Sequence, residues 1–282
     1  MALVPFPNKA AKAAENEDLE PDWDDHDPEP DAGGKMSFLD HLDELRRRII
    51  YSLVAVGVGF AVAFYYIDTI FRFIMVPMQR LLPAGQTLIY TDPAEQFFLL
   101  IKIGLMAGLI IAWPIVFLQV WLFIAPGLYA HEKKLAIPFI AMGTIFFVGG
   151  AAFSHYVVFP IVWRFFASYT TDIVTFMPRV EPAFSMYLRL ILALGLTFQL
   201  PTLVLFLAKM GLITPRFMIR NFKYAVMIII LAAAVLSPDG GGVGMLAMGA
   251  PVVVLYVFSI GLAWGFGKKR RKKSEDENEE PI

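Results

Sequence analysis

The chain has 282 residues, of which 57% are hydrophobic and only 17% are charged, and its formal net charge is -1. Soluble globular domains carry about 25% charged residues. The low charge and the mean hydropathy of +0.61 therefore argue against a soluble domain and favour a polytopic membrane protein. The absence of cysteine excludes disulfide bonds and thiol chemistry.

Residues 1–35 differ in composition from the rest of the chain. The stretch from Glu15 to Asp31 is mostly Asp and Glu and contains three prolines. Such a segment cannot bury enough apolar surface to offset its chain entropy, so we predict a disordered acidic tail. It also lacks the basic start and apolar core of a secretory signal, so it is not predicted to be a cleaved export peptide.

Six long apolar runs follow, within residues 36–267. They cover Ile49–Ile67, Phe97–Leu122, Leu135–Phe159, Phe184–Leu207, Tyr224–Leu236 and Val243–Phe266. A helix needs about 20 apolar residues to cross a 30 Å hydrocarbon core, so the fifth run is short and predicts a locally thinned bilayer or a re-entrant segment. We predict an all-α, polytopic integral membrane protein with six transmembrane helices.

The orientation follows from the distribution of Lys and Arg. Of the 24 such residues, 15 fall on one side of the predicted spans and 4 on the other. The positive-inside rule then places both termini in the cytoplasm, and an even number of spans requires the same arrangement. Residues 268–282 form a charged cytoplasmic C-terminal tail, whose basic cluster also suits contact with anionic lipid. Lys102 and Arg189 fall inside spans, near their outer ends, where long side chains can snorkel.

Sequence motifs for catalysis or cofactor binding are incomplete. His131-Glu132 begins like the zinc-protease signature HExxH, but Leu135 stands where the second histidine is required. The glycine-rich run Asp239–Gly244 lacks the Lys-Ser/Thr and the preceding strand of a phosphate-binding loop. We therefore predict no enzyme activity, no cofactor or metal, no nucleic-acid partner, and an ion gradient or a protein partner as the energy source.

The predicted cytoplasmic face carries two carboxylates of interest. Phe38, Leu42, Leu45 and Ile49 form an apolar stripe at helical spacing, so the first span is entered by an amphipathic helix with Glu44 on another face. Glu132 is an isolated carboxylate in a short basic loop. From the residues alone, a solvated polar face is the favoured interpretation of Glu44, and the alternative for Glu132 is a pair with a neighbouring Lys or Arg.

These residues carry a family resemblance. Ser37–Arg48 resembles the opening of the TatC family, the receptor subunit of the twin-arginine protein translocase, and Gln119–Lys134 resembles its first cytoplasmic loop. Related segments are Thr91–Phe98 with Lys102, Phe159–Pro160, Phe198–Pro201 and Leu236–Asp239. The resemblance covers about Met36 to Gly267, and the acidic N-terminal extension lies outside it.

The resemblance implies a receptor in the bacterial cytoplasmic (inner) membrane that binds twin-arginine signal peptides and exports folded proteins with the proton motive force. It implies TatA/TatB-type single-span subunits and further copies of the chain as partners, with lipid around them. By resemblance, Glu44 and Glu132 hold the arginine pair, with Arg46 and Phe123 as neighbours. Carboxylates suit this role because they accept guanidinium groups bidentately.

Two positions depart from the family pattern. Gln199 stands where many members have a glutamate, and a glutamine cannot bind or release a proton. It either contacts a partner helix or satisfies backbone groups freed by Pro201. The glycine-rich surroundings of Asp239 make that residue a possible functional loop position without a defined role. The alternative function is a secondary transporter of a small charged solute, which predicts paired midplane charges and an inverted repeat.

Overall fold

A computed structural model describes residues 38–82, 86–124, 136–171, 173, 176–237 and 242–266. The chain divides into two units, Met1–Asp40 and His41–Ile282, and the contacts reported below lie within the second. The described residues form helices and contain no strand, which confirms the predicted all-α class. The predicted tails at residues 1–35 and 268–282, together with Glu132 and Asp239, lie outside the described residues.

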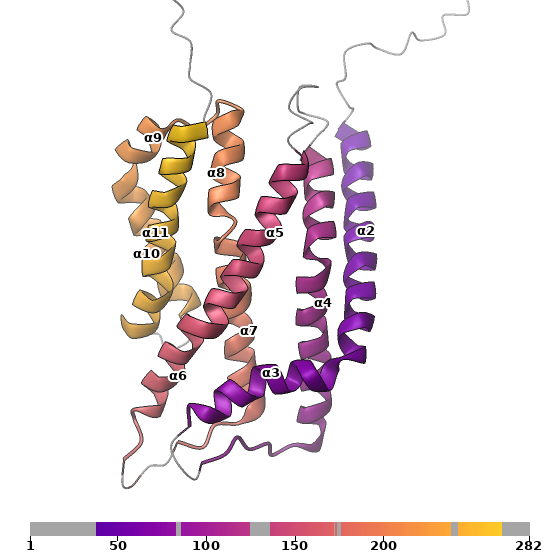
Figure 1. Cartoon of the computed structure of the whole chain (residues 1–282), viewed down its shortest axis with the longest axis vertical. Coiled ribbons are helices and arrows are strands. Elements are labelled where there is room, and N and C mark those ends of the chain that lie inside the picture. The colour runs from indigo at the N-terminus through magenta and orange to yellow at the C-terminus, as the bar shows by residue number, and fades with distance from the viewer. Residues whose placement is uncertain are drawn as a thin grey trace, which may run out of the picture. The chain divides into compact units, whose positions relative to one another are not determined.

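Helices α2, α4 and α10 are longer than the apolar runs that predicted them, whereas the third and fourth runs are each divided among successive helices. In chain order they are α2 (Phe38–Tyr65), α3 (Ile67–Arg80), α4 (Pro93–Ile124), α5 (Ala136–Phe153), the π-helical turn η3 (Ser154–Val158), α6 (Phe159–Ala167), α7 (Val180–Thr197), α8 (Leu200–Lys209), α9 (Pro215–Arg220), α10 (Phe222–Leu236) and α11 (Gly242–Phe266). Figure 1 shows α2, α4, α5 and α7 side by side, with α3 running across them.

Five helical segments among the described residues are long and apolar enough to cross a membrane. They are Leu39–Tyr65, Pro93–Ile124, Ile137–Ala167, Val180–Lys209 and Gly242–Gly265. Helix α10 is apolar but has only 15 residues, as its short sequence run predicted. The structure thus supports five candidate spans, and the sixth remains a prediction.

Helix α3 was not predicted from the sequence. Its buried residues Ile74, Met75 and Met78 lie on one side, while Arg72 and Arg80 keep its average hydropathy low. A helix of this amphipathic kind packs one face against the protein and leaves the other polar. In the folded chain, α3 covers part of the core at the end of the bundle where α2 finishes (Figure 1).

The main core is centred on α7. Phe184, Tyr187, Leu190 and Leu194 are fully or almost fully buried there and belong to one cluster with residues of α3, α4, η3 and α6. Lipid tails are as apolar as these side chains, so helix association inside a membrane depends on close packing and on hydrogen bonds rather than on burial alone.

Helices α2 and α4 approach each other through two glycines. A Cβ atom added at Gly108 would lie 2.5 Å from the backbone nitrogen of Phe60, and one added at Gly59 would collide with the Gly108 carbonyl. Gly104 and Gly108 are spaced four residues apart, as in the small-residue motifs that let membrane helices touch backbone to backbone. This close contact lies in the C-terminal half of α2, about 16 Å along the helix from Arg48.

A polar junction closes the opposite end of the α4–α7 pair. The buried carboxylate of Glu95 accepts hydrogen bonds from the Arg179 guanidinium at 3.0 Å and from the Glu181 backbone N–H at 3.0 Å. Ile89 accepts from the backbone N–H of Val180 at 2.9 Å. These bonds tie the segment before α4 to the start of α7, so both helices begin at the same level.

Candidate functional site

Glu44 and Arg48 face α4 from one side of α2. Their spacing of four residues places them on adjacent turns, and Arg48 Nη2 donates to Glu44 Oε1 at 2.9 Å. The other terminal nitrogen of Arg48, Nη1, donates to Gln119 Oε1 on α4 at 3.2 Å. Arg48 therefore links the predicted binding residue Glu44 to the second helix.

The second oxygen of the Glu44 carboxylate is unpaired among the described residues. Among the described residues, Glu44 Oε2 and Arg48 Nε are buried side-chain atoms without a hydrogen-bond partner. An ionised carboxylate has about four lone-pair positions, and Arg48 uses one of them. Leaving such an acceptor unpaired is costly, so this carboxylate is suited to accept a further cationic donor.

Phe123 lies at the same contact between α2 and α4. We call this contact the seam, and it is formed by His41, Glu44, Arg48, Gln119 and Phe123. Its ring stacks on the His41 ring, with centroids 4.4 Å apart and an interplanar angle of 19°. His41 precedes Glu44 by three residues and so shares its face of α2. The structure thereby brings together two of the predicted site residues, Glu44 and Phe123, and adds His41, Arg48 and Gln119.

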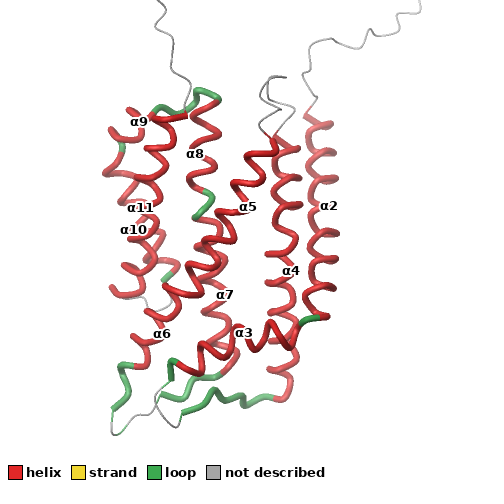
Figure 2. The backbone as a smooth tube through the Cα atoms, in the orientation of Figure 1, coloured by secondary structure: helices red, strands yellow, loops and turns green. Residues whose placement is uncertain are grey.

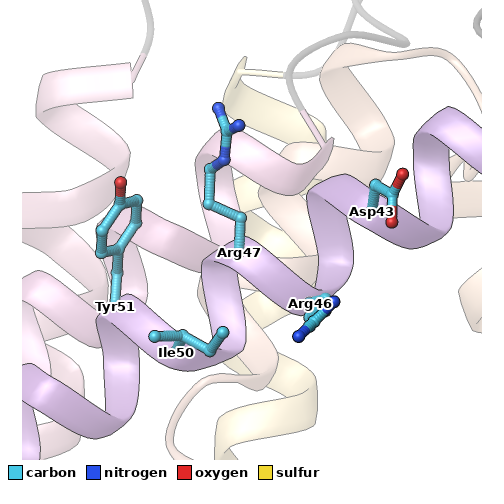
Figure 3. Close-up of a pocket in the computed structure, with 5 residues that line it drawn as sticks. All are labelled: Asp43, Arg46, Arg47, Ile50 and Tyr51. Carbon is cyan, nitrogen blue, oxygen red and sulfur yellow. The ribbon is translucent and has the colours of Figure 1, made fainter.

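Arg46 faces a different side of α2. Two residues along a helix turn the side chain by about 200°, so Arg46 points away from the Glu44 side. Figure 3 shows it beside an open depression that is also lined by Asp43, Arg47, Ile50 and Tyr51. The structure therefore separates Arg46 from the seam that holds Glu44 and Phe123.

Glu132 lies outside the described residues, between α4 and α5 in the chain. Residues 125–135 connect the end of α4, directly after Phe123 and Ile124, to the start of α5. The start of α2, the end of α4 and the start of α5 lie at one end of the bundle (Figure 1). The connection that contains Glu132 thus begins next to the seam.

Gln199 occupies a break between α7 and α8, visible as a short loop in Figure 2. Its Nε2 donates to the Gly143 carbonyl of α5 at 2.8 Å, whereas its Oε1 is buried without a partner among the described residues. Pro201 sits in the first turn of α8, where a missing N–H is tolerated. The Gln199 amide therefore serves a neighbouring helix rather than the backbone next to Pro201.

Sequence reasoning missed three residues of the seam. Arg48 could have been found, since Glu-Arg pairs four residues apart commonly interact on a helix surface. Gln119 and His41 gave no such signal, because their contacts join residues far apart in the chain. Within the described residues, no group of three or more His, Asp or Glu side chains could hold a metal ion.

Comparison with protein families gives one match. Residues 40–251 match the family described as "Sec-independent protein translocase protein (TatC)". This stretch includes all the described site residues and extends from the first turn of α2 into α11.

Individual relatives are similar over most of their length. The Sec-independent protein translocase protein TatC of Koribacter versatilis is 38% identical over 247 residues, covering 86% of this chain and 91% of that protein. The TatC protein of Desulforapulum autotrophicum is 36% identical over 242 residues, covering 86% and 89%.

The fold is also similar to a solved structure. A crystal structure described as the twin arginine translocase receptor TatC superposes with a TM-score of 0.69 at 34% sequence identity. The match covers 79% of this chain and 98% of that structure. The overall arrangement of helices is therefore similar to that of this receptor.

Proposed function

Because the chain belongs to the TatC family of Sec-independent protein translocases, we propose that its α2–α4 seam binds the arginine pair of twin-arginine signal peptides. Membership of this family makes the chain a receptor subunit of the twin-arginine translocase rather than a secondary transporter of a small solute. The proposal concerns which residues of this chain recognise the peptide.

The observation that carries the proposal is that only one of the two Glu44 carboxylate oxygens accepts a hydrogen bond within the described residues. One oxygen accepts from Arg48, while the other is buried without a partner among the described residues. A signal-peptide guanidinium can bond to Oε2, or replace Arg48 in a bidentate pair and leave Arg48 with Gln119. Glu132, on the connection that starts beside Phe123, provides the second carboxylate for the second arginine.

The stacked rings of His41 and Phe123 complete the recognition surface. They lie on the same seam as Glu44 and present an aromatic face to the signal peptide, including the guanidinium plane of an arginine. Arg46 lies away from this seam, so its contribution to peptide binding is through the general charge of the α2 entry region rather than through contact.

The remaining features of the proposal concern the membrane. Both termini lie in the cytoplasm of a bacterium, the chain is in the inner membrane, and α10 provides a sixth, short crossing. This assignment is supported by the excess of Lys and Arg on one set of connections and by the short length of α10. The seam then faces the cytoplasm, where signal peptides arrive.

The partners are single-span subunits of the TatA/TatB type and further copies of the chain, and export draws on the proton motive force. The receptor itself performs no catalysis. The contact surface for a single-span partner includes Gln199 and the half of α10 nearest Leu236. Gln199 Oε1 supports this choice, because it is an acceptor that the described part of the chain leaves unused.

The test is peptide affinity. A labelled twin-arginine peptide and its twin-lysine control are titrated onto the purified protein and onto the variants Glu44→Ala, Glu132→Ala and the double variant. Each single substitution is expected to cost about 1.5–3 kcal/mol, which weakens affinity about 10- to 150-fold.

Asp43→Ala is the matched control, because Asp43 is the neighbouring carboxylate and lines the depression beside Arg46 instead of the seam. It should leave affinity unchanged. Unchanged affinity in the double variant, or equal binding of both peptides, would refute the proposal.

A further inference from the structure

Arg189 occupies the centre of the face of α7 that is turned away from the protein. The core-facing residues of this helix include Phe184, Tyr187, Ile191 and Leu194, all almost fully buried. The exposed residues Pro182, Arg189 and Leu196 recur every seven residues, which is close to two helical turns, so they form a line on the opposite side.

This arginine has no counter-charge within the described residues. None of the ion pairs or side-chain hydrogen bonds found there involves Arg189. Lys102, the cation on the neighbouring α4, is paired with Glu181, which also accepts from Ser185 at 2.7 Å. The local charges of Lys102 and Glu181 therefore cancel, and the charge of Arg189 is uncompensated within the described residues.

Arg189 lies more than two turns inside α7. Glu181 lies in the first turn of α7, and Arg189 follows eight residues later, about 12 Å further along the helix. Arg164, by comparison, lies in the last turn of α6, near the end of its segment. A charged side chain inside a span is expensive and normally pairs with another group or faces a water-filled cavity.

The residues around Arg189 allow another helix to approach. Ser185 and Ala193 flank it one turn away on each side and are small, and Leu196 offers an exposed apolar contact further along. Small residues beside a polar group are typical of helix–helix interfaces in membranes, because they permit close backbone contact and a hydrogen bond between helices.

We propose that this face of α7 docks a transmembrane helix carrying a carboxylate at the depth of Arg189. Charge complementarity selects the occupant, since one uncompensated guanidinium requires one carboxylate. A lipid phosphate is the competing counter-ion, and the experiment below distinguishes it from a carboxylate on a helix. The inference rests on the proposed assembly with single-span subunits. It adds the outward face of α7 to the contact surface proposed above and specifies the chemistry that the docked helix must present.

The experiment uses the full chain in phosphatidylcholine vesicles. The probe is a leucine-rich, 24-residue membrane-spanning peptide with one Glu placed about 12 Å inside the end that aligns with the start of α7. A Gln peptide is the neutral counterpart. Association is measured by energy transfer between fluorophores on the peptide and on the receptor.

The Glu peptide is expected to bind about tenfold more tightly than the Gln peptide, as for one charge-assisted hydrogen bond. Arg189→Gln should abolish this preference and Arg189→Lys should retain part of it. Arg164→Gln is the matched control and should leave the preference intact. Twin-arginine peptide affinity, measured on every variant, establishes that each has folded.

Three results would overturn the inference. They are equal binding of the two peptides, a Glu preference that survives Arg189→Gln, and a solid-state NMR coupling between the Arg189 guanidinium nitrogen and lipid phosphorus that excess Glu peptide does not remove. Each leaves the proposed function intact if the twin-arginine peptide still binds. Conversely, failure of twin-arginine binding by the unmodified chain refutes the proposed function alone, because the leucine-rich probe carries no signal sequence.

Discussion

Gly108→Ala tests whether the α2–α4 crossing positions the binding seam. The new Cβ would lie 2.5 Å from the Phe60 nitrogen and 2.7 Å from the Phe60 Cα, whereas ordinary contacts begin at 3.4 Å. Because both neighbours are backbone atoms, neither can rotate away, so the two helices must separate by about 1 Å. Overpacking of this kind costs about 1–3 kcal/mol.

The separation reaches the seam. The Arg48–Gln119 hydrogen bond between the two helices is already 3.2 Å long, and an added 1 Å takes it beyond hydrogen-bonding distance. Arg48 then loses its hydrogen bond to α4, and Glu44 loses the fixed position of its Arg48 partner. We expect Gly108→Ala to lower both the thermal stability in detergent and the affinity for a twin-arginine peptide.

Two other glycines provide graded controls. A Cβ at Gly104 would lie 3.0 Å from a side-chain atom of Phe60, which can move, and a Cβ at Gly57 would meet nothing within 4 Å. Gly104→Ala should therefore have a smaller effect, and Gly57→Ala should be neutral or stabilising by up to about 1 kcal/mol through helix propensity. Equal melting temperatures and affinities for all three variants would refute the reasoning.

Two further predictions concern Gln199 and α10. Gln199→Leu removes one hydrogen bond and one unpaired buried acceptor, so it should cost at most about 1.5 kcal/mol. The Gln199→Glu variant places a second acceptor opposite the Gly143 carbonyl. The melting temperature of this variant should therefore be lower than that of Gln199→Leu at neutral pH and should recover at acidic pH, where the carboxyl is protonated. A difference that does not depend on pH would contradict this prediction. Four leucines inserted after Ile230 lengthen α10 by about 6 Å, from about 22 Å toward the 30 Å of a typical core. Export from vesicles should fall while peptide binding persists, with a four-alanine insertion as the rotation-matched control; undiminished export would make the short helix a packing detail.

The sequence by itself determined the membrane class, the approximate spans and the candidate carboxylate of α2. Long apolar runs identify spans because hydropathy is summed over a window of neighbouring residues. For this reason Phe97–Leu122 anticipated α4, and the short run at Tyr224–Leu236 anticipated the 15 residues of α10. Glu44 was found through its place in an amphipathic segment and a family motif, which are also local patterns.

The tertiary structure decided the elements and contacts that depend on distant parts of the chain. Helix α3 was not predicted from hydropathy because its arginines lower the mean hydropathy of this segment. Its apolar face is explained only by the core against which it packs. The bond from Arg48 to Gln119 joins residues 71 positions apart, and no local pattern encodes it. The same holds for Arg189: its sequence places it in a span, but only the packing of α7 shows that it faces outward, away from the carboxylates of the described chain. Which neighbour a polar side chain meets inside a membrane is set by how the helices cross, and that is a property of the fold as a whole.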